Sequence, residues 1–363
     1  MAKSKEVAVE SSGKPVRKDK DIIDALKKQF GADIFVTGSY VSERKRTIIP
    51  VSPQFDVMLN GGIREGTFAI STGPPKIGKS SSALDFASTF LETPSEKYGD
   101  RYVYFFDIEG RLNPRDLKGI KGLQKYVEGA ELEHRFTVIK SMPGKIIAGE
   151  EYLAMGEALI NAMPGCLFIF DSFSQLCSSE RRKSEIGKRF RDDIPLYLAD
   201  FCKRVSNVIP INDSIVIGIT HLIANQGQGM SPWLEASGQK IQYQLDVKLR
   251  AKYEQPWKDG ETQIGQKVFW ECHASPIGPP MRQCESRLRY GHGLDKETEL
   301  AMICVDLGHI KKTSAASHWF TILEGTDKYN GLENVREKLV EDPGLYHELY
   351  KRFRETMGFT SQG

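Results

Sequence analysis

Short runs of apolar residues alternate along this chain with segments whose apolar positions recur every three or four residues. The runs GTFAIST, YVYFFD, RFTVIKS, CLFIFD and SIVIGIT each have the length and composition of a buried strand. The segments between them predict a helix from Lys79 to about Leu91 and others near 115–127, 150–163 and 193–208. Continuous apolar strands separated by helices indicate a parallel sheet covered on both faces, which is an α/β fold.

The pattern changes at both ends of this region. DKDIIDALKKQFG predicts a short amphipathic helix, and the polar, lysine-rich residues 1–18 before it predict a mobile arm. QLDVKLRAKY and QKVFWECHA follow one another without a helix, which indicates an antiparallel extension at the edge of the sheet. The tail ENVREKLVEDPGLYHELYKRFRETM predicts helices interrupted at Pro343-Gly344, in a small C-terminal subdomain.

Composition excludes several classes of protein. With 363 residues, 40% hydrophobic and a formal net charge of +2, the chain is typical of a globular protein with one large core. Its six cysteines form no CxxC pair, so we expect neither disulfides nor a zinc site. The longest apolar runs are far shorter than the roughly 20 residues of a membrane span, and MAKSKEVAVE has no apolar signal core, so we expect a cytoplasmic protein without a membrane partner.

The segment GPPKIGKSS at residues 73–81 has the spacing of a phosphate-binding P-loop. An accidental match is the alternative, but the segment follows a predicted strand and opens a predicted helix. Lys79 is expected to reach the β- and γ-phosphates, and the Ser80 hydroxyl to bind magnesium. Because Pro74 and Pro75 lack N–H donors, the amides that hold phosphate are expected from Lys76 onward. The predicted phosphate-binding residues are Gly73, Pro74, Pro75, Lys76, Ile77, Gly78, Lys79, Ser80 and Ser81.

Carboxylates end two of the other predicted strands. Asp171 closes CLFIFD, where it is expected to organise the magnesium ion beside the P-loop, unless it merely ends the strand. YVYFFD is followed by Ile108 and Glu109. A carboxylate there is a candidate general base for the attacking water, and Glu109 is the better candidate because Asp107 still belongs to the strand.

Two segments suggest contact with nucleic acid. SSERRKSEIGKRFRDD carries six cations within eleven residues and one aromatic side chain, which is what binding to single strands requires. A solvated charge run is the alternative. HLIANQGQGMSPWLEASGQK is low in charge and rich in glycine, and loops of that length in a compact domain are usually functional or disordered. The candidate DNA-binding residues in these segments are Arg181, Arg182, Lys183, Lys188, Arg189, Phe190, Arg191, Met230 and Trp233.

Alternatives remain for some of these residues. Trp233 is expected to insert between bases, although it is also suited to a place in the core. Lys203 and Arg204, in the predicted helix DFCKRVS, are candidates for phosphate contacts, although such a pair on a helix often serves only solubility.

Taken in order, these residues resemble the RecA recombinases along nearly the whole chain. LKKQFG resembles the end of that family's N-terminal helix, and FDVMLNGGIREGTFAISTGPPKIGKSS its segment leading into the P-loop. YFFDIEGRLNP resembles the strand with the catalytic glutamate, here Glu109, and FIFDSFSQL the magnesium-binding strand with Asp171 and Ser172. RYGHGLD resembles the stretch that lies against adenine, here Tyr290-Gly291. The order and spacing of these pieces carry the resemblance, since only the P-loop is specific alone.

The resemblance also places the two DNA loops. EIGKRF falls where the family's first DNA-binding loop starts, and ASGQKIQYQLDVKLR resembles the end of the second, which adds Ser237, Gly238 and Gln239 as DNA-binding candidates. It implies a RecA-type ATPase core at 51–285 with DNA loops at about 178–192 and 222–236. The implied flanking regions are an N-terminal helix and polymerisation segment at 19–50 and a C-terminal region at 286–363.

Three departures from the family pattern stand out. His221 follows SIVIGIT where bacterial members place a glutamine that senses the γ-phosphate, which resembles the phage, UvsX-like branch and suggests a viral origin; a simple strand cap is the alternative. ASPIGPPMR at 274–282 lacks the lysines that reach the neighbouring subunit's nucleotide, and Arg282 or a nearby cation is a candidate substitute. Asp116 stands near a tyrosine position beside the base.

The resemblance implies a DNA-dependent ATPase that uses ATP and Mg²⁺. Such a protein forms a helical filament of identical subunits on single-stranded DNA, pairs it with homologous duplex and exchanges strands. A loading mediator and a single-strand binding protein are implied partners. The alternatives are a RecA-like mediator or filament component that exchanges no strands, and a helicase of the same core fold. A small-molecule kinase fits least, because it needs neither DNA loop.

Overall fold

The computed structural model describes residues 19–127, 132–187, 192–224, 233–235, 244–314 and 316–359. The chain divides into two compact units, Met1–Lys45 and Arg46–Gly363. In the first unit, α1 (Asp19–Phe30) confirms the amphipathic helix, and α2 (Gly38–Glu43) follows it. The apolar side chains of α1 at Ile22, Ile23 and Phe30 are exposed.

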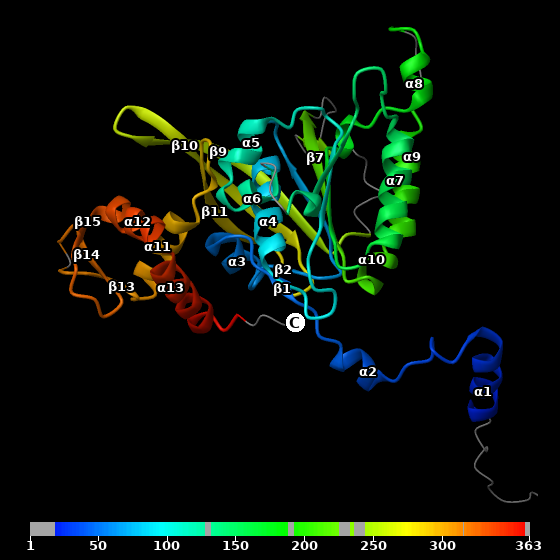
Figure 1. Ribbon diagram of the computed structural model, residues 1–363, viewed down its shortest axis with the longest axis horizontal. Coiled ribbons are helices and arrows are strands. Elements are labelled where there is room, and N and C mark those ends of the chain that lie inside the picture. The colour runs from blue at the N-terminus through cyan, green and yellow to red at the C-terminus, as the bar shows by residue number, and fades with distance from the viewer. Residues whose placement is uncertain are drawn as a thin grey trace, which may run out of the picture. The chain divides into compact units, whose positions relative to one another are not determined.

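A large sheet forms the centre of the second unit (Figure 1). Its strands are β3 (Phe68–Gly73), β4 (Val103–Asp107), β5 (Phe136–Lys140), β6 (Leu167–Asp171), β7 (Ile215–Ala224), β8 (Trp233–Glu235), β9 (Val247–Asp259), β10 (Thr262–Ala274), β11 (Arg282–Arg289) and β12 (Gly293–Leu294). They run in the order β12-β11-β10-β9-β3-β7-β6-β4-β5, with β8 paired to β7. Neighbours from β9 to β5 are parallel, whereas β10, β11 and β12 add antiparallel strands at one edge, as expected.

Helices cover both faces of the parallel strands (Figure 1). They are α4 (Lys79–Glu92), α7 (Gly149–Ala162), α9 (Ile194–Val205) and α10 (Val208–Ile211). Alternate residues of β6 enter two separate cores: Leu167 and Ile169 share a cluster with α4, while Phe168 and Phe170 share one with α7 and α9. Burial on both faces explains the unbroken apolar run CLFIFD and confirms the α/β prediction.

The segment after β4 differs from the single helix expected at 115–127. It consists of α5 (Pro114–Gly119), a 3₁₀ turn at Lys121–Leu123 and α6 (Gln124–Val127). Gly122 lies against α4 so closely that a Cβ atom there would be 1.9 Å from the Ser88 hydroxyl oxygen. The chain leaves the helical conformation earlier, at Ile120 (φ −83°, ψ 103°), so the prediction of one helix was wrong.

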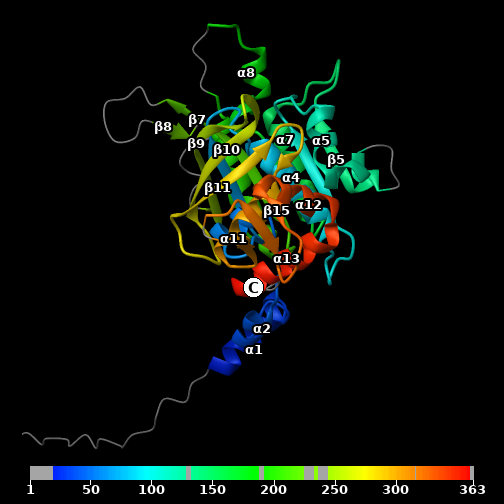
Figure 2. The ribbon, with the colours of Figure 1, turned by 90° about the vertical axis from the view of Figure 1, so that its left-hand side faces the viewer.

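Smaller elements complete the second unit. They are β1 (Ile48–Ile49), α3 (Pro53–Leu59), β2 (Ile63–Arg64), α8 (Ser179–Lys183), α11 (Lys296–Asp306), β13 (Ile310–Lys312), β14 (Trp319–Ile322), β15 (Tyr329–Asn330), α12 (Gly331–Glu341) and α13 (Pro343–Thr356). The break between α12 and α13 at Pro343 agrees with the sequence pattern. Strands β13 to β15 form a three-stranded sheet, which with α11, α12 and α13 surrounds the third hydrophobic cluster (Figure 2).

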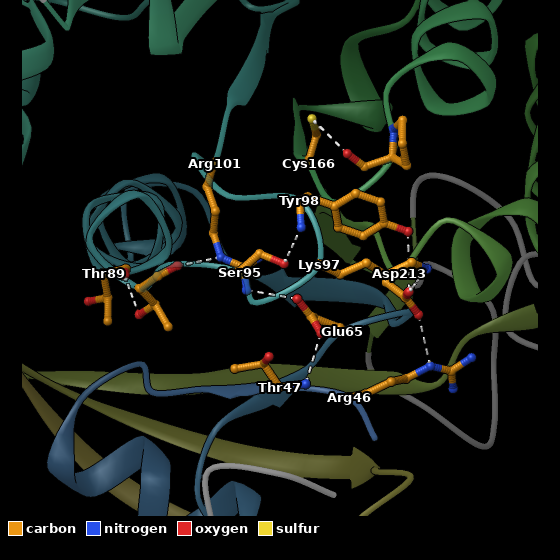
Figure 3. Close-up of polar contacts among 12 residues, drawn as sticks. Arg46, Thr47, Glu65, Thr89, Ser95, Lys97, Tyr98, Arg101, Cys166 and Asp213 are labelled. Carbon is orange, nitrogen blue, oxygen red and sulfur yellow. Dashed lines mark hydrogen bonds and ion pairs between the residues drawn. The ribbon is translucent and has the colours of Figure 1, made fainter. Parts of the chain in front are cut away.

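Two groups of ion-paired side chains lie near the amino ends of the parallel strands (Figure 3). The buried Arg101, before β4, binds Glu65 Oε1 at 2.7 Å. Asp213, before β7, binds Arg46 at 3.3 Å and Lys97 at 2.9 Å. The carboxyl ends of the same strands carry the candidate catalytic residues, so structural and chemical polar groups lie at opposite ends of the sheet. No helix in the described ranges has the length and apolar character needed to cross a membrane.

Candidate functional site

The loop between β3 and α4 has the backbone conformation that its glycines allow. Gly78, directly before α4, has φ of +95°, a region that side chains with a Cβ atom rarely adopt. A Cβ atom at Gly73 would lie 2.8 Å from that of Ala251, so the loop and β9 pack too closely for a larger residue. The loop therefore leads into the amino end of a buried helix, where N–H groups and the helix dipole attract phosphate.

Lys79 is the buried cation of this loop, with 4% of the residue exposed. Its Nζ donates to the carbonyl oxygens of Gly73 at 3.0 Å and Pro74 at 2.6 Å. Burial lowers the pKa of Lys79 to about 8, and the negative charges of Asp171 and Glu109 partly oppose that change. A phosphate oxygen would give this ammonium group a charged partner, which binds more strongly than a carbonyl.

Asp171 and Ser80 are brought together beside Lys79. Burial raises the pKa of Asp171 to about 6, a hydrogen bond from Ser80 opposes the rise, and the nearby charges of Glu109 and Asp107 add to it. Asp107 pairs in register with Asp171 on the neighbouring strand. A hydroxyl and a carboxylate amid other carboxylates are oxygen ligands that suit Mg²⁺, whose charge would relieve their repulsion. The residues present therefore fit the predicted metal site.

Glu109 lies next to this pair, held by backbone and side-chain hydrogen bonds. Its N–H donates to the Asp171 carbonyl oxygen at 3.1 Å. Its Oε1 accepts from the Ser172 hydroxyl at 2.9 Å and lies 2.6 Å from Nε2 of His221. The hydrogen bond with His221 lowers the pKa of Glu109 against the opposing effect of burial, so the carboxylate is ionised and able to accept a proton.

Asp107 is excluded as the free base by its own contacts. Its two carboxylate oxygens accept from the backbone N–H groups of Arg111 and Leu112, at 3.0 and 3.3 Å. Asp107 therefore shapes the turn that presents Glu109, in agreement with the preference for Glu109 drawn from the strand pattern.

His221 joins the phosphate loop to the chain beyond β7. It pairs in register with Gly73, and its N–H donates to the Ser174 hydroxyl at 2.8 Å. Within the described residues its Nδ1 atom is buried and has no hydrogen-bond partner. Residues 225–232, which follow β7, lie outside the described residues.

A pocket of about 710 Å³ lies between α5 and the turn that joins β11 to β12. Its lining residues are Ser81, Asn113, Pro114, Arg115, Asp116, Gly119, Ile120, Leu288, Arg289, Tyr290, Gly291, His292 and Gly293. Tyr290 and Gly291 therefore line one pocket with Ser81 of the P-loop. A Cβ atom at Gly119 would lie 2.3 Å from the Gly291 carbonyl oxygen, so the two walls touch at one end.

Sequence reasoning missed Asn113, Arg115 and His292 in this pocket. The sequence signal for Asn113 was the Asn-Pro pair, which marks the start of a helix. In the structure the Asn113 N–H donates to the Asp116 carboxylate at 3.1 Å, as in a capping box. It also missed a row of cations at alternate positions of β9: Lys248, Arg250 and Lys252. Arg282, the suggested substitute contact to a neighbouring subunit, donates to the Val57 carbonyl oxygen of its own chain at 3.0 Å.

The predicted DNA-binding residues are only partly within the described residues. Arg181, Arg182 and Lys183 form the exposed last turn of α8, which Ser178 caps. Figure 2 shows α8 and the β7–β8 pair near the same end of the sheet. The candidates outside the described residues are Lys188, Arg189, Phe190, Arg191, Met230, Ser237, Gly238 and Gln239.

Two other DNA-binding candidates have contacts of their own. Arg204 pairs with Glu157 at 2.8 Å and with Asp200 at 3.6 Å, while Lys203 lies beside it in the last turn of α9. The backbone of Trp233 begins β8, opposite Ala224 of β7. Part of the second predicted loop is thus an antiparallel strand pair.

Comparison with known proteins shows which sequences this chain resembles. No protein-family model matches the chain. A RecA protein of Streptomyces rimosus is 25% identical over 336 residues, covering 92% of this chain and 83% of the relative. RecA of Saccharopolyspora erythraea is 26% identical over 318 residues, 87% of this chain and 85% of the relative, and RecA of a Nocardioides species is 25% identical over 336 residues, 92% and 89%.

These relatives are bacterial proteins and give no support to the suggested phage branch. The parallel sheet with its antiparallel extension and P-loop agrees with the sequence similarity. Over nearly its whole length the chain is therefore similar to RecA proteins.

Proposed function

We propose that this protein is a DNA-dependent ATPase that exchanges DNA strands as a helical filament. The observation that carries the proposal is the convergence of Lys79, Glu109 and Asp171 at the carboxyl ends of three parallel strands. A phosphate-binding cation, a base and a metal ligand in one place are the parts that phosphoryl transfer to water requires. The similarity to RecA proteins supports the coarser conclusion of a recombinase.

Each residue has a separate role in this proposal. The amides of Lys76 to Ser81 and the Lys79 ammonium group bind the phosphates of ATP, and Tyr290 and Gly291 lie against the base. Ser80 and Asp171 would hold Mg²⁺, which neutralises charge on the phosphates when it is bound. Glu109 accepts a proton from the attacking water, and the hydrogen bond with His221 keeps its carboxylate in the ionised form that can do so.

His221 connects hydrolysis to DNA in the proposal. Its side chain contacts Glu109, and the predicted second DNA loop begins at the next residue, 222. A change in the contacts of His221 when nucleotide binds therefore alters the start of that loop, which couples two distinct sites. The cations of α8 supply phosphate contacts to single-stranded DNA, and homologous duplex DNA is the second partner.

The proposed assembly is a filament of identical subunits in the cytoplasm, with loading mediators and single-strand binding proteins as candidate partners. The exposed apolar residues of α1 support a role for residues 19–50 in contact with another copy. A mediator that binds ATP and DNA without strand exchange is the competing function.

The test measures ATP hydrolysis by the wild-type protein with and without single-stranded DNA, followed by a strand-exchange assay with homologous duplex. We expect hydrolysis to rise with DNA and strand exchange to require ATP. Hydrolysis unaffected by DNA would refute the proposal, whereas stimulated hydrolysis without exchange would favour the mediator. Electron microscopy with a non-hydrolysable ATP analogue distinguishes open filaments from the closed rings of a helicase.

A further inference from the structure

The turn at Tyr290–His292 forms one wall of the pocket of about 710 Å³, which we call the base pocket. A short pair of strands carries this turn. Arg289 ends β11 and pairs with Gly293 of β12, so Tyr290, Gly291 and His292 form the tip between them. The Tyr290 N–H donates to the Ile264 carbonyl oxygen at 3.0 Å, and the His292 N–H to that of Arg289 at 3.1 Å. The tip is therefore held by β10 through Ile264 and by the end of β11 through Arg289.

Arg289 is bound by the C-terminal helices. Its Nε lies 2.7 Å from Asp295 Oδ2, before α11, and its second guanidinium nitrogen lies 3.1 Å from Glu333 Oε1 on α12. Arg336, one turn further along α12, binds the same two carboxylates at 2.9 and 3.2 Å. We call Arg289, Asp295, Glu333 and Arg336 the charge quartet.

Burial makes this arrangement rigid. The side chains of Asp295, Arg289 and Arg336 are 1%, 14% and 17% exposed, whereas that of Glu333 is 48% exposed. Asp295 also accepts from the Thr298 N–H at 3.0 Å, which fixes it to the start of α11. Removal of one partner from a buried ion pair leaves an uncompensated charge, so the quartet changes as a unit when any member is altered.

Cavities lie beside the charge quartet, so its ion pairs, and not close packing, hold Arg289 in place. A second cavity of about 650 Å³ lies between the core and the C-terminal helices, and Arg289, His292, Gly119 and Ile120 line both this cavity and the base pocket. Arg289 thus stands between two cavities. Its stacking on the Trp257 ring, 4.7 Å from the ring centroid, comes from the core, and its ionic contacts come from the C-terminal helices.

We propose that Arg336 and Glu333 are positioning residues for the base of a nucleoside triphosphate. Through Arg289 they hold the Tyr290–His292 turn in the position that receives the base, so α12 sets the affinity for the base without touching the nucleotide. The inference rests on the proposed function, because it assigns a base to this pocket. It adds that the C-terminal helices and the base pocket influence each other's stability.

The test compares a ligand with a base and one without it. For Arg336→Met we expect the KM for ATP to rise about 5-fold or more, a value typical of coupling between sites, with kcat within about 2-fold of wild type. The inhibition constant of inorganic tripolyphosphate should not change, because that ligand uses the P-loop alone. A merely structural role would weaken both ligands together.

Matched variants distinguish the quartet from general effects of charge or folding. Arg352→Met on α13 removes an arginine that also binds two glutamates, at 3.3 and 2.9 Å, but lies away from the turn, so ATP and tripolyphosphate binding should both be unchanged. Arg336→Lys should restore part of the ATP affinity. Should Arg336→Met not fold, Glu333→Gln serves in its place, because Glu333 is half-exposed.

The outcomes separate this inference from the proposed function. Normal ATP binding by the wild-type protein, with unchanged KM in Arg336→Met and Glu333→Gln, would overturn the inference alone. Equal weakening of ATP and tripolyphosphate would also overturn it. Absence of ATP binding by the wild-type protein would overturn the proposed function and the inference with it.

Discussion

The carboxylate oxygen Oε1 of Glu109 lies 2.6 Å from Nε2 of His221, and the same oxygen accepts a hydrogen bond from Ser172. An ionised carboxylate only accepts, so Nε2 carries the proton in this pair. Two donors on one oxygen favour the ionised form of Glu109 and use the electron pairs of Oε1. The other oxygen, Oε2, lies 3.6 Å from a guanidinium nitrogen of Arg111. We infer that Oε2 is the atom that takes the proton from water.

The first prediction concerns Glu109 itself. Glu109→Gln keeps the size of the side chain but removes its basicity, so we expect DNA-stimulated hydrolysis of ATP to fall about 10²- to 10⁴-fold. Binding of ATP should change little, because the phosphates contact the P-loop. The measurement is single-turnover hydrolysis alongside equilibrium nucleotide binding.

Glu92→Gln provides the control for that experiment. Glu92 ends α4 and forms an exposed pair with Lys125 at 3.1 Å, so its replacement should leave hydrolysis unchanged. A Glu109→Gln protein that hydrolyses ATP at the wild-type rate would exclude this residue as the base.

The second prediction concerns communication through His221. We expect ATP to raise the affinity of the wild-type protein for single-stranded DNA, and His221→Ala to reduce this effect by about 5-fold or more, because the residue that contacts Glu109 and leads to the DNA loop is lost. His221→Gln should retain part of the effect, because its amide donates a hydrogen bond. Fluorescence anisotropy of labelled DNA with and without a non-hydrolysable ATP analogue measures the difference.

The reference measurement for His221→Ala is made without nucleotide. Under that condition the DNA affinity of the variant should match that of the wild type, because the cations of α8 are unchanged. If ATP raises DNA affinity equally in both proteins, His221 does not carry the coupling.

The strands and the P-loop were predictable from sequence for a local reason. Each buried parallel strand is an apolar run, and the phosphate loop is a contiguous segment whose glycines set its conformation, so neither depends on distant residues. Asp171 and Glu109 were predictable as well, because strand ends place them at one edge of the sheet. Their actual contacts, such as the hydrogen bond between Glu109 and His221, depend on pairing across strands far apart in the chain.

The missed features all depend on contacts distant in sequence. The predicted helix at 115–127 breaks at Ile120, which is buried in the same hydrophobic cluster as residues of α4. Asn113 and His292 meet only when α5 lies against the β11–β12 turn. Short strands such as β13 contain too few residues for an alternating pattern to identify them.

The third prediction tests the P-loop backbone. Gly78 has φ of +95°, and a Cβ atom there would approach Leu288 to 3.2 Å. A strain of about 1–3 kcal/mol at this position would be relieved by a shift of the loop that displaces its phosphate-binding amides. We therefore expect Gly78→Ala to weaken nucleotide binding about 10-fold or more, equivalent to about 1.4 kcal/mol. Isothermal titration with ATP measures the change.

Gly144→Ala is the matched control for backbone strain. Gly144 has φ of +80° with nothing within 4 Å of a Cβ atom, so its replacement should affect stability but not nucleotide affinity. Pro75→Ala should also leave affinity nearly unchanged, since the proline supplies no amide. Equal losses in Gly78→Ala and Gly144→Ala would assign the effect to stability rather than to the phosphate site.

The fourth prediction concerns the cations of α8. Neutralising Arg182 and Lys183 together by substitution with glutamine should weaken single-stranded DNA binding. The slope of log affinity against log salt should fall by about 1.4, because each phosphate contact to a single strand contributes about 0.7. Salt titration of DNA binding measures the slope, and Lys351→Gln on α13 should leave it unchanged. An unchanged slope in the double variant would mean that α8 makes no phosphate contacts.

The last prediction uses Glu299 of α11, which is 1% exposed and accepts hydrogen bonds from Ser52 and from two backbone N–H groups. Burial raises its pKa to about 7, against the opposing effect of the Ser52 hydrogen bond. The folded protein therefore binds this proton more tightly than the unfolded chain, and its contribution to stability is lost as the pH rises toward 7. Because Gln does not titrate, the destabilisation caused by Glu299→Gln should be about 2 kcal/mol smaller at pH 8 than at pH 5.5, measured by urea unfolding. Glu324→Gln, at an exposed position, is the control and should change the free energy of unfolding equally at pH 5.5 and pH 8. The same result for Glu299→Gln would show that the Glu299 carboxyl does not titrate between these pH values.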